Sequence, residues 1–208
     1  MNFDNVNHIA IPEGNVKRIT SGGVELWNAD YLRIPYLTIL SYDMIDSGVK
    51  LGSTGTTDVE AEFQFDSNPG TGNVPVLRLG NLVNGGTWVG TTANKWSNGS
   101  GTNSTVPCTT RALLKVLYSK ADKKQSLYVD GLFISDRNFS ASTNNTVLNN
   151  NTLTICYKSA PSVRCYSYKI YDNGSLVRDM VPVRRRTANV ECMFDRVTGN
   201  YYDKVQTT

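Results

Sequence analysis

The feature that most constrains the fold is a pair of alternating segments joined by Asn173-Gly174. In Cys165–Tyr171, aromatic and β-branched residues occupy every second position, which is the period of a strand with one buried face. Asn-Gly is the favoured pair for a type I′ turn, because both central residues of that turn need a positive φ. The segment 176–183 then predicts a return strand, so the chain should contain a long hairpin in the middle of a sheet.

The register of this hairpin predicts which of its residues face the core. Tyr168 and Ile170 should share the inward face, with Leu176 or Val177 opposite. Pro182 has no N–H to donate, and we expect it to mark the point where the return strand leaves the ladder.

The same stretch carries a resemblance to a known family. The segment YSYKIYDNGSLVRDMVPVRR, followed by MFDRVTGNYY, resembles the C-terminal signature of concanavalin-like, laminin-G-like jelly-roll domains in structural proteins of bacteriophages and prophages. The hairpin predicted at Asp130-Gly131 matches a further element of that family, whereas Glu191–Phe194 departs from its usual Gly-Leu/Met-Tyr. The resemblance implies an all-β, concanavalin-like jelly-roll sandwich that belongs to a virion.

The first residues form a different unit. Residues 1–29 contain three short alternating segments separated by turns, which predicts a small β-meander with little core of its own. Residues 30–208 should form the sandwich. By resemblance, the meander attaches the sandwich to capsid or tail subunits, or to a second copy of the chain; extra strands on the sandwich are the alternative. The apolar residues that should make this anchor are Ile11, Pro12, Val16, Ile19, Leu26 and Trp27.

Charge and cysteine content exclude several classes. The net charge of +3 over 208 residues is too small to indicate a nucleic-acid partner, and the basic run 184–186 is interpreted as a solvated strand end, with an anion-binding patch as the alternative. No apolar segment approaches the ~20 residues of a membrane helix, and no signal peptide is predicted, so we expect synthesis in a bacterial cytoplasm and residence in the virion. The four cysteines lack zinc spacing and should be buried thiols.

Glycan binding is predicted at one polar loop. Residues 91–105 are rich in Asn, Ser, Thr and Gly but contain Trp96. A tryptophan in such a polar loop is expected either to be buried or to bind a ligand. With Trp88, Asn98 and Asn103 it would supply aromatic platforms beside amide groups. The alternative is that Trp96 folds back onto the sandwich.

Two chemical alternatives remain. Glu60 and Glu62 share one face of the strand predicted over 58–65 and so resemble the paired acids of glycosidases on this fold, but two solvated carboxylates are the simpler interpretation. Calcium is the one ion that laminin-G-like relatives suggest. The candidate calcium ligands are aspartates in loops or at strand ends, where the preference of Asp for turns explains their presence better than metal binding does. Those candidates are Asp43, Asp46, Asp130 and Asp136.

We therefore expect a non-enzymatic bacteriophage structural protein without a cofactor: a head decoration, a head fibre or a tail component. A host-surface glycan is the candidate ligand of its outward-facing sandwich. The alternatives are a glycosidase on the same fold and a prophage-encoded surface adhesion module.

Overall fold

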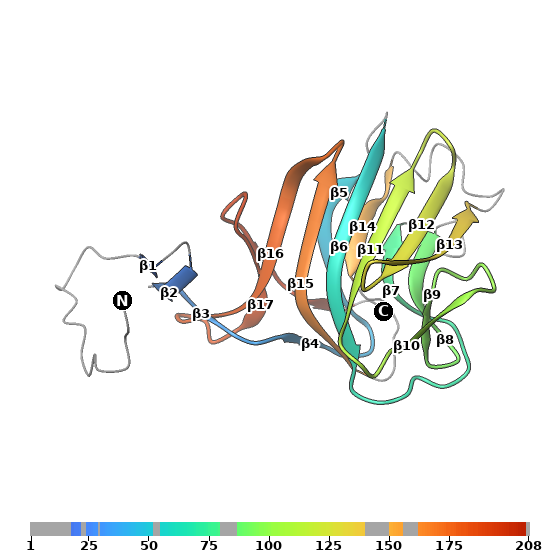
Figure 1. Cartoon of the computed structure of the whole chain (residues 1–208). Coiled ribbons are helices and arrows are strands. Elements are labelled where there is room, and N and C mark those ends of the chain that lie inside the picture. The colour runs from blue at the N-terminus through green and yellow to red at the C-terminus, as the bar shows by residue number, and fades with distance from the viewer. Residues whose placement is uncertain are drawn as a thin grey trace, which may run out of the picture.

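A computed structural model describes residues 18–21, 24–28, 30–51, 55–79, 87–139, 150–155 and 162–206. From residue 30 onward they form two antiparallel sheets packed face to face, so the predicted all-β sandwich is confirmed (Figure 1). In this described part, no helix is long and apolar enough to cross a membrane.

The larger sheet contains the predicted hairpin. Its strands run in the order β13 (Leu132–Asn138), β12 (Lys124–Val129), β11 (Ala112–Ser119), β6 (Thr56–Phe65), β15 (Val163–Asp172), β16 (Ser175–Arg185), β17 (Glu191–Asp195) and β18 (Tyr201–Tyr202). Two further short strands join it, β3 (Tyr31–Arg33) beside β16 and β4 (Leu37–Ile39) beside β15.

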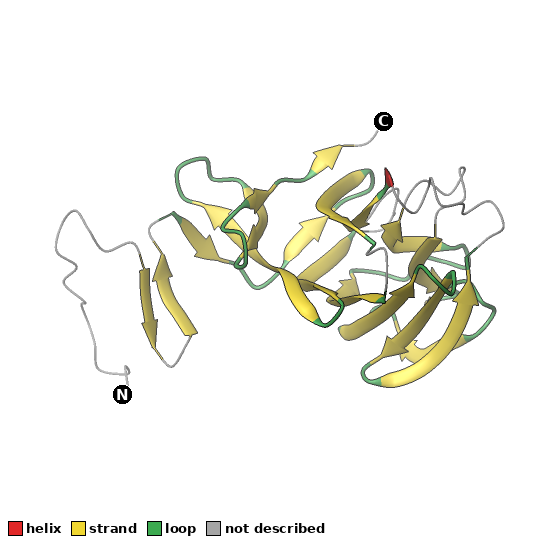
Figure 2. Ribbon diagram, turned by 90° about the horizontal axis from the view of Figure 1, so that it is seen from above, coloured by secondary structure: helices red, strands yellow, loops and turns green. Residues whose placement is uncertain are grey.

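The smaller sheet closes the other side of the core. Its strands run in the order β10 (Asn103–Pro107), β9 (Lys95–Ser97), β8 (Thr87–Thr92), β7 (Val74–Leu79), β14 (Thr152–Ile155), β5 (Asp43–Lys50) and β19 (Val205–Gln206). Figure 2 gives the same arrangement from above.

Strict alternation on β6 shows how the sequence builds the core. Val59, Ala61, Phe63 and Phe65 are at most 1% exposed, whereas the acidic and amide residues between them face outward. Because β6 pairs with both β11 and β15, this apolar row lies at the centre of the larger sheet.

The central hairpin is confirmed. Asn173 and Gly174 have φ angles of 49° and 78°, as a type I′ turn requires, and Asp172 pairs with Ser175 across the turn. Tyr168 and Ile170 are fully buried. Of the two residues predicted opposite them, Val177 packs against the core, whereas Leu176 is 41% exposed.

Pro182 marks a change of neighbour within β16. The ladder between β15 and β16 has its last pair at Tyr168 and Met180, but β16 continues and pairs with β17 on one side and with β3 on the other. The carbonyl of Pro182 accepts the N–H of Ile34 at 3.2 Å. The two hairpin strands therefore diverge here, and the chain from β3 to β4 fills the gap; we call this place the sheet fork.

Gly174→Val should lower the free energy of unfolding by at least about 1 kcal/mol, because a side chain with a Cβ is strained at the positive φ of this turn. Urea unfolding of both variants would measure it, with Ser175→Val at the adjacent exposed strand position as the control. Equal stability of the two variants would show that the turn does not hold the hairpin.

The N-terminal hairpin lies outside both sheets. β1 (Arg18–Ser21) and β2 (Val24–Asn28) pair with each other in a separate sheet, and Figures 1 and 2 both show them beyond β3. The Arg186 guanidinium and N–H each donate to a carbonyl at the junction, those of Asn28 and Asp30, both at 3.0 Å. Two of the three predicted short strands are therefore present. The remaining predicted strand and the anchor candidates Ile11, Pro12 and Val16 lie outside the described residues.

Candidate functional site

The predicted tryptophan platform is wrong. Trp96 is fully buried, and its ring centroid lies 5.9 Å from that of Phe65 in the core. Trp88 is only 6% exposed. The physical reason is that residues 91–105 include β9 and β10, and pairing of Thr91 with Trp96 turns the indole into the sandwich. A buried ring cannot stack on a sugar.

Asn98, one of the two predicted amide ligands, has a structural role. Asn98 is fully buried: its Oδ1 accepts the Ser135 hydroxyl at 2.9 Å, and its carbonyl accepts the Arg137 guanidinium at 2.7 Å. These bonds connect the end of β9 in one sheet to β13 in the other. Asn103 pairs with Ser97 in the β9–β10 ladder. The polar composition of this stretch therefore closes one edge of the sandwich.

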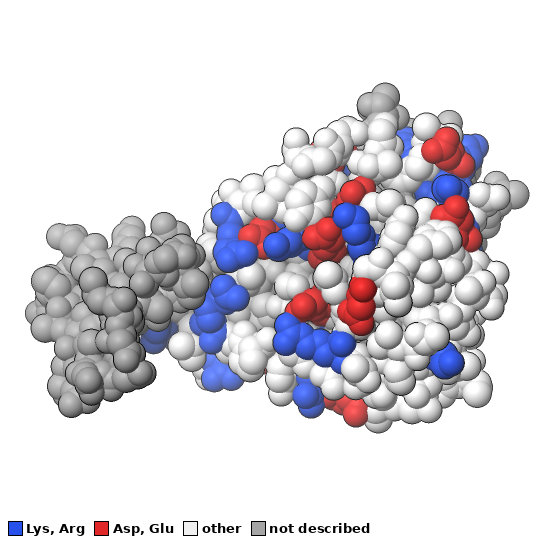
Figure 3. Space-filling model, in the orientation of Figure 1, with Lys and Arg blue, Asp and Glu red and all other residues white. Residues whose placement is uncertain are grey.

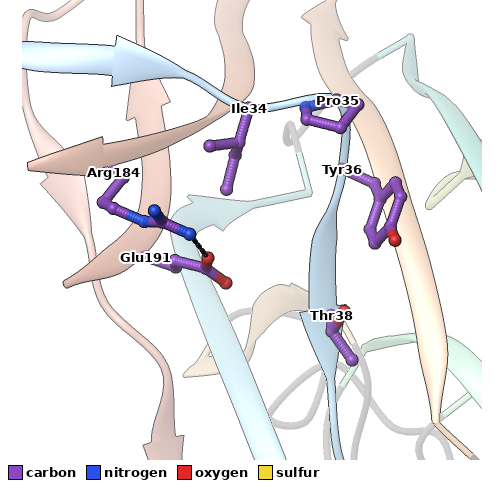
Figure 4. Close-up of a pocket in the computed structure, with 6 residues that line it drawn as sticks. All are labelled: Ile34, Pro35, Tyr36, Thr38, Arg184 and Glu191. Carbon is purple, nitrogen blue, oxygen red and sulfur yellow. Dashed lines mark hydrogen bonds and ion pairs between the residues drawn. The ribbon is translucent and has the colours of Figure 1, made fainter. Parts of the chain in front are cut away.

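The sheet fork instead forms a groove of about 280 Å³. It exists because Pro35 bends the chain between β3 and β4, so that these two strands can pair with diverging partners. Figure 4 shows the bend, with the Arg184–Glu191 pair on one side and side chains of the β4 segment on the other. The lining residues are Ile34, Pro35, Tyr36, Thr38, Arg184 and Glu191.

Tyr36 is the aromatic residue among those that line the groove, and its ring contacts Arg164 and Tyr166. The Arg164 guanidinium lies 4.7 Å from the Tyr36 ring centroid, and the Tyr166 ring meets it edge-on at 5.6 Å. Tyr166 is itself fixed, because its hydroxyl donates to Gln64 at 2.6 Å and Arg111 lies 4.1 Å from its ring centroid. This packing fixes one orientation of Tyr36 before any ligand arrives.

The charges around the groove are balanced. Arg184 Nη2 lies 2.5 Å from Glu191 Oε1, with the two side chains 44% and 35% exposed. Arg164 pairs with Asp66 at 2.5 Å. Figure 3 shows basic and acidic side chains side by side across this face of the larger sheet.

The basic run 184–186 is likewise paired. Arg185 donates to both carboxylate oxygens of Asp203, at 2.6 and 2.8 Å, and Arg186 donates to the Asn28 carbonyl. The solvated strand end is therefore the better interpretation, and no anion patch is needed to explain these residues.

Glu60 and Glu62 lie on the outward face of β6 and do not line the groove. Glu60 pairs with Lys115 at 3.0 Å, and Glu62 pairs with Arg111. Each carboxylate thus has its own cation, as expected of a solvated face. Glu191 is the single carboxylate among the lining residues of the groove.

Each calcium candidate accepts a hydrogen bond from a nearby backbone or side-chain donor. Asp43 accepts the Leu40 N–H, Asp46 the Gly48 N–H and Asp130 the Leu113 N–H, at 2.8–3.1 Å. The Ser126 hydroxyl and then Lys124 lower the pKa of Asp136. Across the described ranges, no three metal-ligating side chains come together.

The cysteines within the described ranges are inert. Cys108, Cys165 and Cys192 are buried free thiols, and burial raises the pKa of Cys108 and Cys192 to about 11. These two side chains are therefore protonated at neutral pH and are poor nucleophiles. Cys156 lies outside the described residues.

Comparison with known proteins identifies no family. No family model matches the chain, and no curated protein is similar to it. Among solved structures, it is similar to the CBM40 domain of a Ruminococcus gnavus sialidase bound to α2,3-sialyllactose, with a TM-score of 0.42 and 12% identity over 65% of this chain and 91% of that one. It is also similar to the binding domain of botulinum neurotoxin DC in complex with rat synaptotagmin II, with a TM-score of 0.39 and 11% identity over 71% of this chain and 42% of that one. Likenesses this weak support no inference about what the chain binds.

Proposed function

We propose that this chain is a non-enzymatic structural protein of a bacteriophage particle, attached through its N-terminal residues and displaying the sandwich. The observation that carries the proposal is the β1–β2 hairpin outside both sheets. An isolated two-stranded hairpin is marginally stable in water. Its sequence nevertheless contains Ile19, Leu26 and Trp27, whose apolar surface would be buried by a partner subunit.

The sequence resemblance supports the same function. The signature segment corresponds to β15 and β16, the central hairpin, and to the turn that joins β17 to β18. These residues form the frame of the sandwich, so the resemblance lies in the part of the chain that determines the fold. Within the groove, Glu191 pairs with Arg184 and no second carboxylate is present to act with it, which favours a non-catalytic role.

The test is incorporation of the full chain into particles. Leu26→Ser with Trp27→Ser should reduce the amount that co-sediments with purified particles at least about tenfold, because burial of each side chain contributes roughly 1.5–3 kcal/mol. The control is Val190→Ser with Val197→Ser, which removes two exposed apolar side chains of the sandwich, 40% and 47% exposed. Wild-type incorporation of the Leu26/Trp27 variant, or flanking genes that encode no capsid or tail protein, would overturn the proposal.

A further inference from the structure

We propose that the groove at the sheet fork binds one neutral pyranose unit. The inference deepens the display function proposed above by naming a ligand class, but it concerns the groove alone and is tested without particles. Its starting point is size. A volume of about 280 Å³ is slightly below the usual range of ligand pockets, and it suits a single sugar ring better than an oligosaccharide.

The aromatic wall supplies the apolar contact. One side of a pyranose presents C–H groups, and aromatic side chains commonly line sites that take such amphipathic ligands. Tyr36 lines the groove, and its ring is clamped by Arg164 and Tyr166. Binding therefore costs little loss of side-chain freedom at this residue.

The polar wall matches neighbouring hydroxyl groups. A sugar hydroxyl both donates and accepts hydrogen bonds, so two adjacent hydroxyls suit one donor beside one acceptor. Arg184 is a pure donor with several N–H groups, Glu191 is a pure acceptor, and their ion pair holds them side by side. Both are partly exposed, which leaves bonding positions free for a ligand at a small desolvation cost. Thr38, on the β4 side of the groove, adds a hydroxyl across from this pair.

The charge balance selects a neutral sugar over an acidic one. An acidic sugar or a phosphate would gain from Arg184 but would also lie beside the Glu191 carboxylate. Arg164, the other cation near Tyr36, is already paired with Asp66. Among the residues that form this wall, each cation therefore already has a carboxylate partner, and an anionic ligand would find no free positive charge.

The experiment is NMR titration of the full-length protein with methyl glycosides of glucose, galactose and mannose, and with the methyl glycoside of N-acetylneuraminic acid as the acidic probe. At least one neutral glycoside should bind saturably with a Kd on the order of 1 mM, shifting the signals of Tyr36 and Thr38. Glu191→Gln keeps the shape but weakens the acceptor, and should raise that Kd at least about tenfold. Glu60→Gln is the matched control, because Glu60 is also an ion-paired carboxylate on this face, 28% exposed and 3.0 Å from Lys115.

Three results would overturn the inference: no saturable binding of any neutral glycoside, preferential binding of the acidic probe, or equal affinities of the Glu191→Gln and Glu60→Gln variants. Failure of the particle role can be told apart from failure of this one. If the protein binds sugar but does not join particles, only the particle role is refuted. If it joins particles but binds no sugar, only the sugar site is refuted.

Discussion

Gly90→Ala should lower the free energy of unfolding by about 3 kcal/mol. A Cβ at this position would lie 2.0 Å from the carbonyl oxygen of Val74 and 2.7 Å from Cα of Pro75. Both are backbone atoms of β7, the strand that pairs with β8 at Gly90. Neither can move away without breaking the ladder, and a glycine at such a close approach of two backbones has no substitute.

Equilibrium unfolding in urea measures this effect, and Gly72→Ala is its control. A Cβ at Gly72 would have no neighbour within 4 Å, so that variant should stay within about 0.5 kcal/mol of the wild type. If the two variants unfold at the same urea concentration, the close approach at Gly90 has been relaxed by some movement of β7.

Asp195→Ala should cost a comparable amount, about 3 kcal/mol. The Asp195 side chain is fully buried, and its Oδ1 accepts the N–H groups of Asp179 and Val197 at 2.9 and 3.1 Å. Its Oδ2 accepts the Thr198 hydroxyl at 2.7 Å and lies 3.6 Å from Arg178 Nε. Alanine would leave these donors unsatisfied in a buried place, which costs more than the bonds themselves contribute.

Thermal and urea unfolding of three variants would test the role of Asp195. Asp195→Asn keeps one oxygen for the two N–H groups and should fall between the wild type and Asp195→Ala. Asp203→Ala removes a carboxylate whose side chain is 49% exposed and ion-paired with Arg185, and should change stability by less than about 1 kcal/mol. A loss for Asp203→Ala as large as that for Asp195→Ala would refute the buried role of Asp195.

The sequence predicted those elements whose pattern is local. The Asn173-Gly174 turn and the alternation on β6 are present in the structure, because each is determined by residues that are adjacent in the chain. Residues 112–118, whose apolar spacing would also suit a helix turn, lie in β11.

The polar stretch around Trp96 was mispredicted for a physical reason. Its polarity suggested a solvated loop, but several of its polar groups bond within the protein: the backbone N–H of Trp96 donates to the Ser104 hydroxyl at 3.1 Å, and Asn98 accepts the hydroxyl of Ser135 in the opposite sheet. A segment whose polar groups are satisfied internally can be buried, and composition alone does not reveal which partners it will find.

The groove was missed because it depends on pairings between distant parts of the chain. Tyr36 and Thr38 alternate with the buried residues Leu37 and Ile39, so their outward direction was readable beside the bend at Pro35. Their proximity to Arg184 and Glu191 could not be predicted in the same way. It requires β3 and β4 to pair with β16 and β15, which follow much later in the chain. The one local indication of the groove was Glu191, where the sequence departs from the usual pattern of the family that it resembles.

That long-range pairing sets the order in which the chain can fold as it is synthesised. Leu37 and Ile39 emerge from the ribosome long before their strand partner β15, which begins at Val163. β5 of the smaller sheet likewise pairs with β19, so both sheets gain strands from segments that are made much later. Non-local β pairing of this kind is slow, and apolar strands stay exposed to solvent until their partner strands have been made. The fork therefore closes only after β15 and β16 have left the ribosome, and crowded nascent copies are most prone to aggregate before that moment.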